Sequence, residues 1–254
     1  MADTIKVYLA ASAEDSRAAE GTGIPGAWLF YRIGESGALQ RAAAPISGKG
    51  GVMGLRGGEH LEAAEPARLA RDIFMECSRR GLRGVLLDFD ADIDTEKLTA
   101  LCAQFAQKQM PYFVSPGLLG AAPGAKIVVS SALSGGSFEA MLSEYSARFG
   151  ADNLCLEIVR MCHDFTMPSY SPSGVQLSGR QFNDIVRKAN PTPYFSPEMQ
   201  CKYFTYSLEG EAHFLLFDDP DTAAGKIDAA QRAGFYGAFL LYSEWGAQAK
   251  QIVG

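Results

Sequence analysis

Two aspartates at the end of one apolar run are the residues of this chain whose spacing points first to chemistry. The segment reads Gly84-Val-Leu-Leu-Asp-Phe-Asp90, and its continuous apolar run is typical of a parallel strand buried on both faces. Strand alternation places Leu86, Asp88 and Asp90 on one face, so the two carboxylates would point the same way. Because neighbouring like charges raise one pKa, one group could stay protonated and act as an acid.

Two other interpretations of this acidic run are open. Asp88 and Asp90 can form a solvated strand end, followed by Asp92 and by Asp94, which is placed to cap the next helix. The four alternating aspartates also suggest a calcium loop, although the glycine and distal glutamate of an EF-hand are missing.

The other metal-ligating and nucleophilic residue types show no useful spacing. His60 and His213 have no metal-ligand pattern around them, and the five cysteines contain no C-x-x-C pair. His163 and Asp164 are adjacent, so on a strand they face opposite ways and do not form a catalytic pair by themselves. An odd number of cysteines indicates reduced, buried thiols. We therefore expect no metal and no cofactor.

Length and charge narrow the class of protein. The chain has 254 residues, which is close to the length of one (β/α)₈ barrel, and 47% of them are hydrophobic. The formal net charge is −6 and the basic residues do not cluster, which disfavours nucleic acids and anionic membranes as partners. No signal peptide is visible at Met1–Thr4, so a cytoplasmic location is the default expectation.

Apolar runs alternate with amphipathic patterns along most of the chain. Strands are predicted at 5–10, 27–32, 51–55, 84–90, 112–114, 126–130, 154–159 and 237–242, and helices at about 65–79, 94–108, 137–149 and 220–233. Between the last two strands, residues 166–218 hold five prolines, a short predicted helix near 178–188 and a hairpin that pairs 203–207 with 213–217. The alternation predicts a closed (β/α)₈ TIM barrel, with an open doubly wound sheet as the alternative.

Three segments of the C-terminal half resemble one enzyme family. The first reads Asn153-Leu-Cys-Leu-Glu-Ile-Val-Arg-Met-Cys-His-Asp-Phe-Thr-Met-Pro168. It is similar to the segment K-L-x-L-G-I-P-x-Y-G-Y-D-W-T-L-P of family 18 glycoside hydrolases of the bacterial spore-cortex lysin type. Tyr194–Tyr206 resembles that group's Y-D-x-E-x-Q-x-P-Y-F-x-Y, and His213–Pro220, continued by Lys226, resembles H-x-V-W-F-D-D-x-x-S-x-x-x-K.

This resemblance implies a fold, a substrate class and a mechanism. The fold would be one (β/α)₈ barrel over residues 1–254, with a small α+β insertion after the seventh strand at about 166–218. The substrates would be polymers of β-linked N-acetylglucosamine, such as chitin and peptidoglycan glycan strands. The mechanism would be substrate-assisted: the acetamido group of the substrate replaces the usual nucleophile, and the enzyme supplies a general acid and groups that orient the acetamide.

The catalytic motif of this family is only partly present. In its fourth-strand pattern D-G-x-D-x-D-x-E, Gly84 and Asp88 match, Leu86 replaces an aspartate, and Asp90 stands where the acidic glutamate belongs. Aspartate is one methylene shorter than glutamate, and a retreat of about 1 Å can cost on the order of a hundredfold in rate.

The candidate substrate-binding residues follow the same resemblance. The sixth-strand pattern M-x-Y-D corresponds to Val128–Ser134, which has neither tyrosine nor aspartate, so Ser131 is the candidate donor. Tyr242 or Trp245 would replace the eighth-strand tryptophan on which the sugar stacks, and Asp164 matches the seventh-strand Y-D pair. Tyr8 on the first strand completes the set. Ordinary packing is the alternative for each aromatic residue.

Three functions are open at this point. The first is a catalytically impaired barrel that binds an N-acetylglucosamine-containing glycan or a protein partner at its mouth. The second is an active glycoside hydrolase with Asp90 as the acid and Asp88 orienting the substrate. The third is a scaffold without a glycan site. The resemblance leaves an extracellular or spore-associated location open, and the oligomeric state is not predicted.

Overall fold

The computed structural model describes residues 4–44, 50–90, 92–133, 135–168 and 174–254. Some residues on which predictions rest lie outside these ranges. They are residues 1–3 at the N-terminus, Ser134 of the sixth-strand motif and residues 169–173 of the predicted insertion.

Parallel strands close into a barrel, so the predicted fold class is confirmed. Within the described residues, eight parallel strands follow the order β1-β14-β8-β7-β6-β5-β4-β2, and pairing of β1 with β2 closes the ring. A short antiparallel strand, β3, extends β2 on the outside and was not predicted. The barrel strands are β1 (Lys6–Ala11), β2 (Gly26–Ile33), β4 (Val52–Arg56), β5 (Val85–Leu87), β6 (Tyr112–Val114), β7 (Lys126–Ser130), β8 (Leu154–Ile158) and β14 (Gly237–Leu241), with β3 at Leu39–Arg41.

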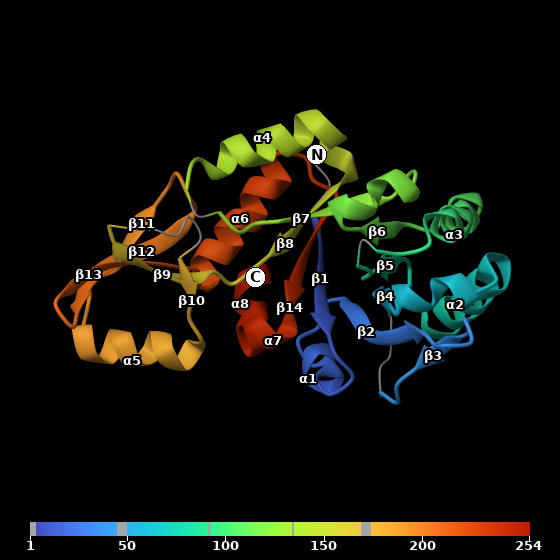
Figure 1. Cartoon of the computed structure of the whole chain (residues 1–254), viewed down its shortest axis with the longest axis horizontal. Helices are drawn as coiled ribbons and strands as arrows, with labels where there is room; N and C mark the ends of the chain where they lie inside the picture. Colours follow the sequence, from blue (N-terminus) through green and yellow to red (C-terminus); the bar gives the residue numbers. More distant parts are fainter. Residues whose placement is uncertain (1–3, 45–49, 91, 134, 169–173) are drawn as a thin grey trace.

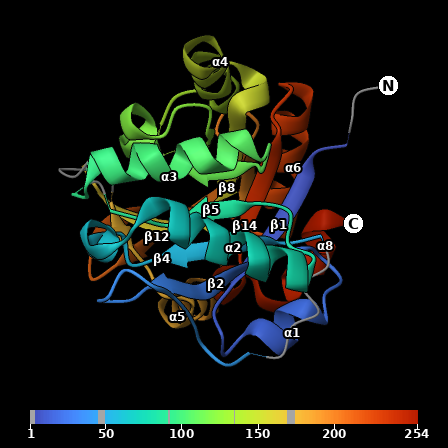
Figure 2. The same ribbon diagram turned by 90° about the vertical axis from the view of Figure 1, so that its right-hand side faces the viewer.

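Four long helices lie outside the barrel and have clear local start and stop signals. The carboxylate of Glu65 caps α2, which ends at Gly81 in the left-handed conformation that glycine adopts without strain. Asp219 and Thr222 form a reciprocal capping box at the start of α6. In Figures 1 and 2, α2 and α3 run side by side on the outer surface. The long helices are α2 (Pro66–Arg80), α3 (Thr95–Gln107), α4 (Phe138–Phe149) and α6 (Pro220–Arg232).

Short helical turns occupy several of the loops and the C-terminal end. They are α1 (Ser16–Glu20), α7 (Tyr242–Trp245) and α8 (Ala249–Val253), and the 3₁₀ turns η1 (Gly58–Ala63), η2 (Pro116–Ala121), η3 (Ala151–Asn153) and η4 (Gly246–Gln248). Among the described helices, none is both long and apolar enough to cross a bilayer.

The predicted strand 84–90 was too long. β5 ends at Leu87, and Phe89 packs closely against Gly58, where an added Cβ would lie 2.8 Å from the Phe89 ring. The N–H of Asp88 still donates to the carbonyl of Leu55 on β4, but residues 88–90 are no longer in a strand.

The insertion between β8 and α6 forms a small antiparallel sheet with one helix, which lies beside the barrel in Figure 1. The predicted hairpin is confirmed, with Tyr206 opposite His213 and Thr205 opposite Phe214. The helix α5 packs Phe182 against Phe204 and Phe217 of this sheet. The insertion consists of β9 (Cys162–Met167), β10 (Val175–Gln176), α5 (Gly179–Ala189), β11 (Tyr194–Ser196), β12 (Cys201–Leu208) and β13 (Glu211–Phe217).

Two apolar layers hold the barrel. The larger one lies between the strands and the outer helices and includes Ile73, Leu101 and Leu156. The smaller one fills the barrel interior and includes Tyr8, Val52, Phe113, Cys155 and Phe239. The inner layer sets the depth to which any ligand can enter, because its side chains occupy the lower part of the barrel.

Candidate functional site

A pocket of about 280 Å³ lies at the carboxyl ends of the barrel strands. This is the end at which barrel proteins place their active sites. Its wall combines apolar side chains with four polar ones that come from four different strand ends. The lining residues are Ala10, Leu29, Arg56, Leu86, Leu87, Asp88, Phe89, Ser115, Val128, Glu157, Phe239, Leu240 and Leu241.

Tyr8 lies below this pocket rather than in its wall. Ala10 lines the pocket, and Tyr8 is two residues earlier on the same strand, so it faces the interior one layer deeper. Its ring stacks on Phe239 at a centroid distance of 5.2 Å and meets Phe113 at 6.0 Å. Burial raises the pKa of Tyr8 to about 12. Tyr8 thus supports the floor of the pocket from beneath.

Asp88 is the predicted carboxylate that reaches the pocket. Its Oδ2 accepts a hydrogen bond from Nε of Arg56 at 2.8 Å, and both side chains are about half exposed. An exposed pair of this kind contributes little to stability. Its effect on the pocket is to compensate one negative charge with one positive charge.

Glu157 places a second carboxylate in the same pocket, from β8. No described residue makes a hydrogen bond or an ion pair to its side chain, which opens to the pocket. Glu157 is exposed where the pocket opens, but partial desolvation by the surrounding protein still raises its pKa, and the negative charges of Glu244 and Asp88 raise it further. Glu157 is therefore an unpaired acid in an environment that disfavours its charge.

Asp90 is not among the residues that line the pocket. It is exposed and follows Phe89, which does line the pocket. Further along, Asp94 accepts a hydrogen bond from the backbone N–H of Lys97 at 3.0 Å and caps α3, as expected for a strand-to-helix connection. The described part of the chain contains no group of three or more His, Cys, Asp or Glu residues arranged to hold a metal ion.

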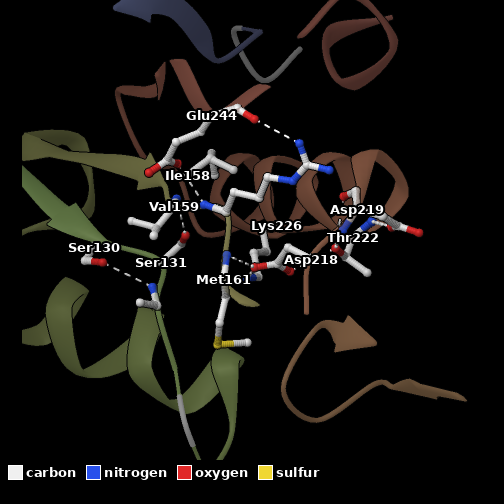
Figure 3. A network of polar contacts seen from close by, with 12 residues as sticks. Ser130, Ser131, Ile158, Val159, Met161, Asp218, Asp219, Thr222, Lys226 and Glu244 are labelled. Atoms are coloured by element: carbon white, nitrogen blue, oxygen red, sulfur yellow. Dashed lines mark hydrogen bonds and ion pairs between the residues drawn. The ribbon is translucent and has the colours of Figure 1, made fainter. Parts of the chain in front are cut away.

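Ser131 is fully buried and takes part in the backbone network of Figure 3. Its Oγ accepts a hydrogen bond from the backbone N–H of Val159 at 3.0 Å, and its own N–H donates to the carbonyl of Glu157. The neighbouring Ser130 is exposed, and its Oγ accepts a hydrogen bond from the nearby N–H of Ala132 at 3.1 Å. Ser131 thus holds the end of β8, and no part of it faces the pocket opening.

Trp245 and Tyr242 pack at the end of the barrel. Trp245 is 1% exposed, and its indole N–H donates to the carbonyl of Ile158 at 2.9 Å. The guanidinium of Arg160 covers the indole ring at 5.1 Å. Tyr242 begins α7 and is partly buried against the outer core. Neither ring lines the pocket, and Leu241 occupies the corresponding part of its wall.

Asp164 lies in the insertion, away from the mouth. Its Oδ2 forms a hydrogen bond with Nδ1 of His213 at 2.8 Å, and both side chains are about one-tenth exposed. The His213 ring stacks on Tyr206 at 4.8 Å. This pair joins β9 to β13 inside the small sheet, which is a structural position.

A buried ion pair fastens the insertion to the barrel, as Figure 3 shows. Nζ of Lys226 on α6 donates to Asp218 at 2.7 Å, and both side chains are fully buried. Asp218 also accepts hydrogen bonds from Thr222 and from the backbone N–H of Met161. The start of the insertion, its last strand and α6 therefore meet at one carboxylate.

The sequence prediction missed Arg56 and Glu157. Arg56 carried no signal, because an arginine at a strand end is common on any surface. Glu157 did carry one: the motif that Asn153–Pro168 resembles has glycine at this position, and here a charged side chain interrupts Leu-Cys-Leu-Glu-Ile. A carboxylate within a parallel barrel strand is unusual, because such strands are buried on both faces, so its presence indicates a functional position.

Comparison with known proteins supports the fold. No family model matches the sequence, and no curated protein sequence matches it either. The structure is similar to the spore cortex-lytic enzyme SleL of Bacillus megaterium, with a TM-score of 0.63 and 13% identity over 97% of this chain and 74% of that one. It is also similar to a chitinase of Chromobacterium violaceum, with a TM-score of 0.62 and 14% identity over 97% and 99% of the two chains.

A plant protein shares the same architecture. The class V chitinase of Nicotiana tobaccum has a TM-score of 0.65 and 10% identity over 99% of this chain and 98% of its own. Matches of this kind extend over the whole barrel and its insertion. The chain thus has a chitinase-like (β/α)₈ barrel, in agreement with the resemblance seen in its sequence.

Proposed function

We propose that this chitinase-like barrel binds an N-acetylglucosamine-containing glycan at its mouth without hydrolysing it by the family 18 mechanism. The observation that carries the proposal is the composition of the pocket wall. Asp90, which stands in the position of the general acid, is not among the residues that line the cavity in which a sugar would lie.

The polar groups that would assist a general acid and orient the acetamide are also missing from the pocket wall. Leu86 lines the pocket where the family motif has an aspartate, and it offers neither charge nor a hydrogen bond. Ser131, the candidate donor to the acetamide, already bonds the backbone of β8. Substrate-assisted cleavage needs both a proton donor at the leaving group and polar groups around the acetamide.

The size and lining of the pocket suit one sugar ring. Its volume of about 280 Å³ is at the lower end of the range for small-molecule sites. Apolar walls from Leu29, Val128 and Phe239 would contact the faces of a ring, while Asp88, Arg56 and Ser115 offer hydrogen bonds to hydroxyl groups. We therefore expect the mouth to hold the end of a glycan, with the rest of the chain outside.

Calorimetric titration with the N-acetylglucosamine tetramer tests this function. The wild-type protein is expected to bind it, and Asp88→Asn is expected to weaken binding about tenfold or more, because a charged hydrogen-bonding group in the pocket is lost. Asp90→Asn is the matched control and should leave the affinity unchanged.

Two results would overturn the proposal. Turnover of the tetramer that disappears in Asp90→Asn would indicate an active hydrolase. Failure of the wild-type protein to bind either this tetramer or a peptidoglycan fragment would indicate a scaffold or a site for a protein partner.

A further inference from the structure

We infer that the pocket recognises a free amine, and that its ligand is a glucosamine unit of a partly de-N-acetylated glycan, held by the carboxylate of Glu157. This inference rests on the proposed function and adds the chemical class of the sugar. It starts from the position of Glu157, where the motif that this segment resembles has glycine. The mouth therefore carries a carboxylate from β8, while Asp88 is the one carboxylate of the fourth-strand motif that lines the pocket.

The charges around the pocket leave Glu157 without compensation. Among the lining residues, Arg56 is paired with Asp88 at 2.8 Å, so the formal charge of the lining is −1 and resides on Glu157. Such a residual charge attracts a cation and repels an anion.

The neighbouring elements supply no cation for Glu157. Glu244 on α7 brings a further negative charge, and its Oε2 accepts the backbone N–H of Arg160 at 2.9 Å. The guanidinium of Arg160 donates to the carbonyl of Glu244 and lies over the Trp245 ring. The guanidinium of Arg160 is thus directed at other partners.

An ammonium group on the ligand would correct this imbalance. Glu157 lines the pocket without a partner among the described residues, and like charges nearby make its negative charge less favourable until a cation reaches it. The raised pKa of Glu157, caused by partial desolvation and by the charges of Glu244 and Asp88, agrees with this. A glucosamine ammonium offers a charge and three N–H donors, whereas an acetamide is neutral.

The rest of the pocket agrees with an amine rather than an acetamide. The tyrosine and aspartate that position the acetamide in the resembling family are absent from Val128–Ser134. At this strand the pocket is lined by Val128, whose apolar side chain offers no hydrogen bond to a ligand. Recognition by charge at β8 would therefore replace recognition of the acetamide at β7.

Paired titrations with tetramers of glucosamine and of N-acetylglucosamine test the inference. The wild-type protein is expected to bind the glucosamine tetramer about tenfold more tightly or better, the effect of one charge-assisted hydrogen bond. Glu157→Gln, which keeps the shape and removes the charge, should abolish this preference and change the affinity for the acetylated tetramer little. Glu211→Gln, at an exposed glutamate of the insertion hairpin, is the control for the general acidity of the protein.

The outcomes separate the two proposals. Equal or tighter binding of the acetylated tetramer, or a preference that survives in Glu157→Gln, overturns the inference and leaves the proposed function standing. A preference lost equally in Glu211→Gln also overturns it, because the attraction would then come from overall charge. Binding of neither tetramer overturns the proposed function itself.

Discussion

The mouth of the barrel depends on three charged side chains, of which Asp88 is the one predicted. Asp88 and Arg56 compensate each other, and both are accessible to solvent. Glu157 is uncompensated and has a raised pKa. A group of this kind lowers the stability of the free protein at neutral pH. Such locally destabilising groups are common at functional sites.

Replacement of Glu157 by glutamine is expected to raise the melting temperature at pH 7. Because the folded-state pKa is raised, the folded protein binds more protons than the unfolded chain between the two pKa values. Stability therefore falls as pH rises from the unfolded glutamate value of about 4.3 through the folded one, and it stays lower above it. The gain in Glu157→Gln should be present at pH 7 and shrink toward pH 4.

Thermal melts across pH 4–8 measure this effect. Glu211→Gln provides a reference for the removal of an exposed charge. A melting temperature of Glu157→Gln below that of the wild-type protein at pH 7 would contradict the expected destabilisation by this carboxylate.

At the scale of elements, the end of β8 is anchored by three side chains. Ser131 bonds the N–H of Val159, Trp245 bonds the carbonyl of Ile158, and Glu244 bonds the N–H of Arg160. Figure 3 shows the serine, the glutamate and the strand end converging. These contacts hold rigid the strand that carries Glu157, and this explains why the predicted sugar-binding roles of Ser131 and Trp245 fall on buried residues.

Ser131→Ala is expected to lower the free energy of unfolding by about 1 kcal/mol, because the N–H of Val159 loses its hydrogen bond to Oγ and keeps the longer one, of 3.2 Å, to the carbonyl of Glu157. Ser130→Ala is the matched control: the same change at an exposed neighbour should stay within about 0.5 kcal/mol. Urea titrations of both variants measure the difference. Equal effects would mean that the bond to Val159 does not stabilise the strand end.

At the scale of the molecule, the insertion and the barrel share the buried pair of Asp218 and Lys226. A fully buried charge is tolerated only when its partners are present, and here Asp218 collects donors from α6 and from the first residues of the insertion. Since Met161 and Asp218 also bond through their backbones, the two ends of the insertion meet at this point.

Lys226→Met is expected to cost about 3–5 kcal/mol, because it leaves a carboxylate buried without its cation. Lys202→Met is the control: Lys202 pairs with Asp219 and Asp221 at a quarter-exposed position and should cost about 1 kcal/mol or less. Denaturant unfolding compares the two. The double variant Asp218→Asn/Lys226→Met should recover part of the loss, and a loss no larger than that of Lys202→Met would show that the pair does not fasten the insertion.

The sequence by itself determined the barrel and the insertion. Apolar runs of strand length, alternating with capped amphipathic helices, are local patterns that survive in the folded chain. The hairpin turn is equally local, with Glu209 and Gly210 both in the left-handed region at φ of 54° and 88°. Such features need only the neighbouring residues, so they could be predicted without a structure.

Only the tertiary structure decided which carboxylates meet. β5 ends at Leu87 and Phe89 packs against Gly58, and of the two aspartates that follow the strand Asp88 lines the pocket and Asp90 does not. Glu157 reaches the same pocket from a distant part of the sequence, because closure of the barrel brings the ends of β5 and β8 to one mouth. The aspartate pair that opened the sequence analysis is thus replaced by Asp88 and Glu157, since strand ends and barrel closure are properties of the whole fold.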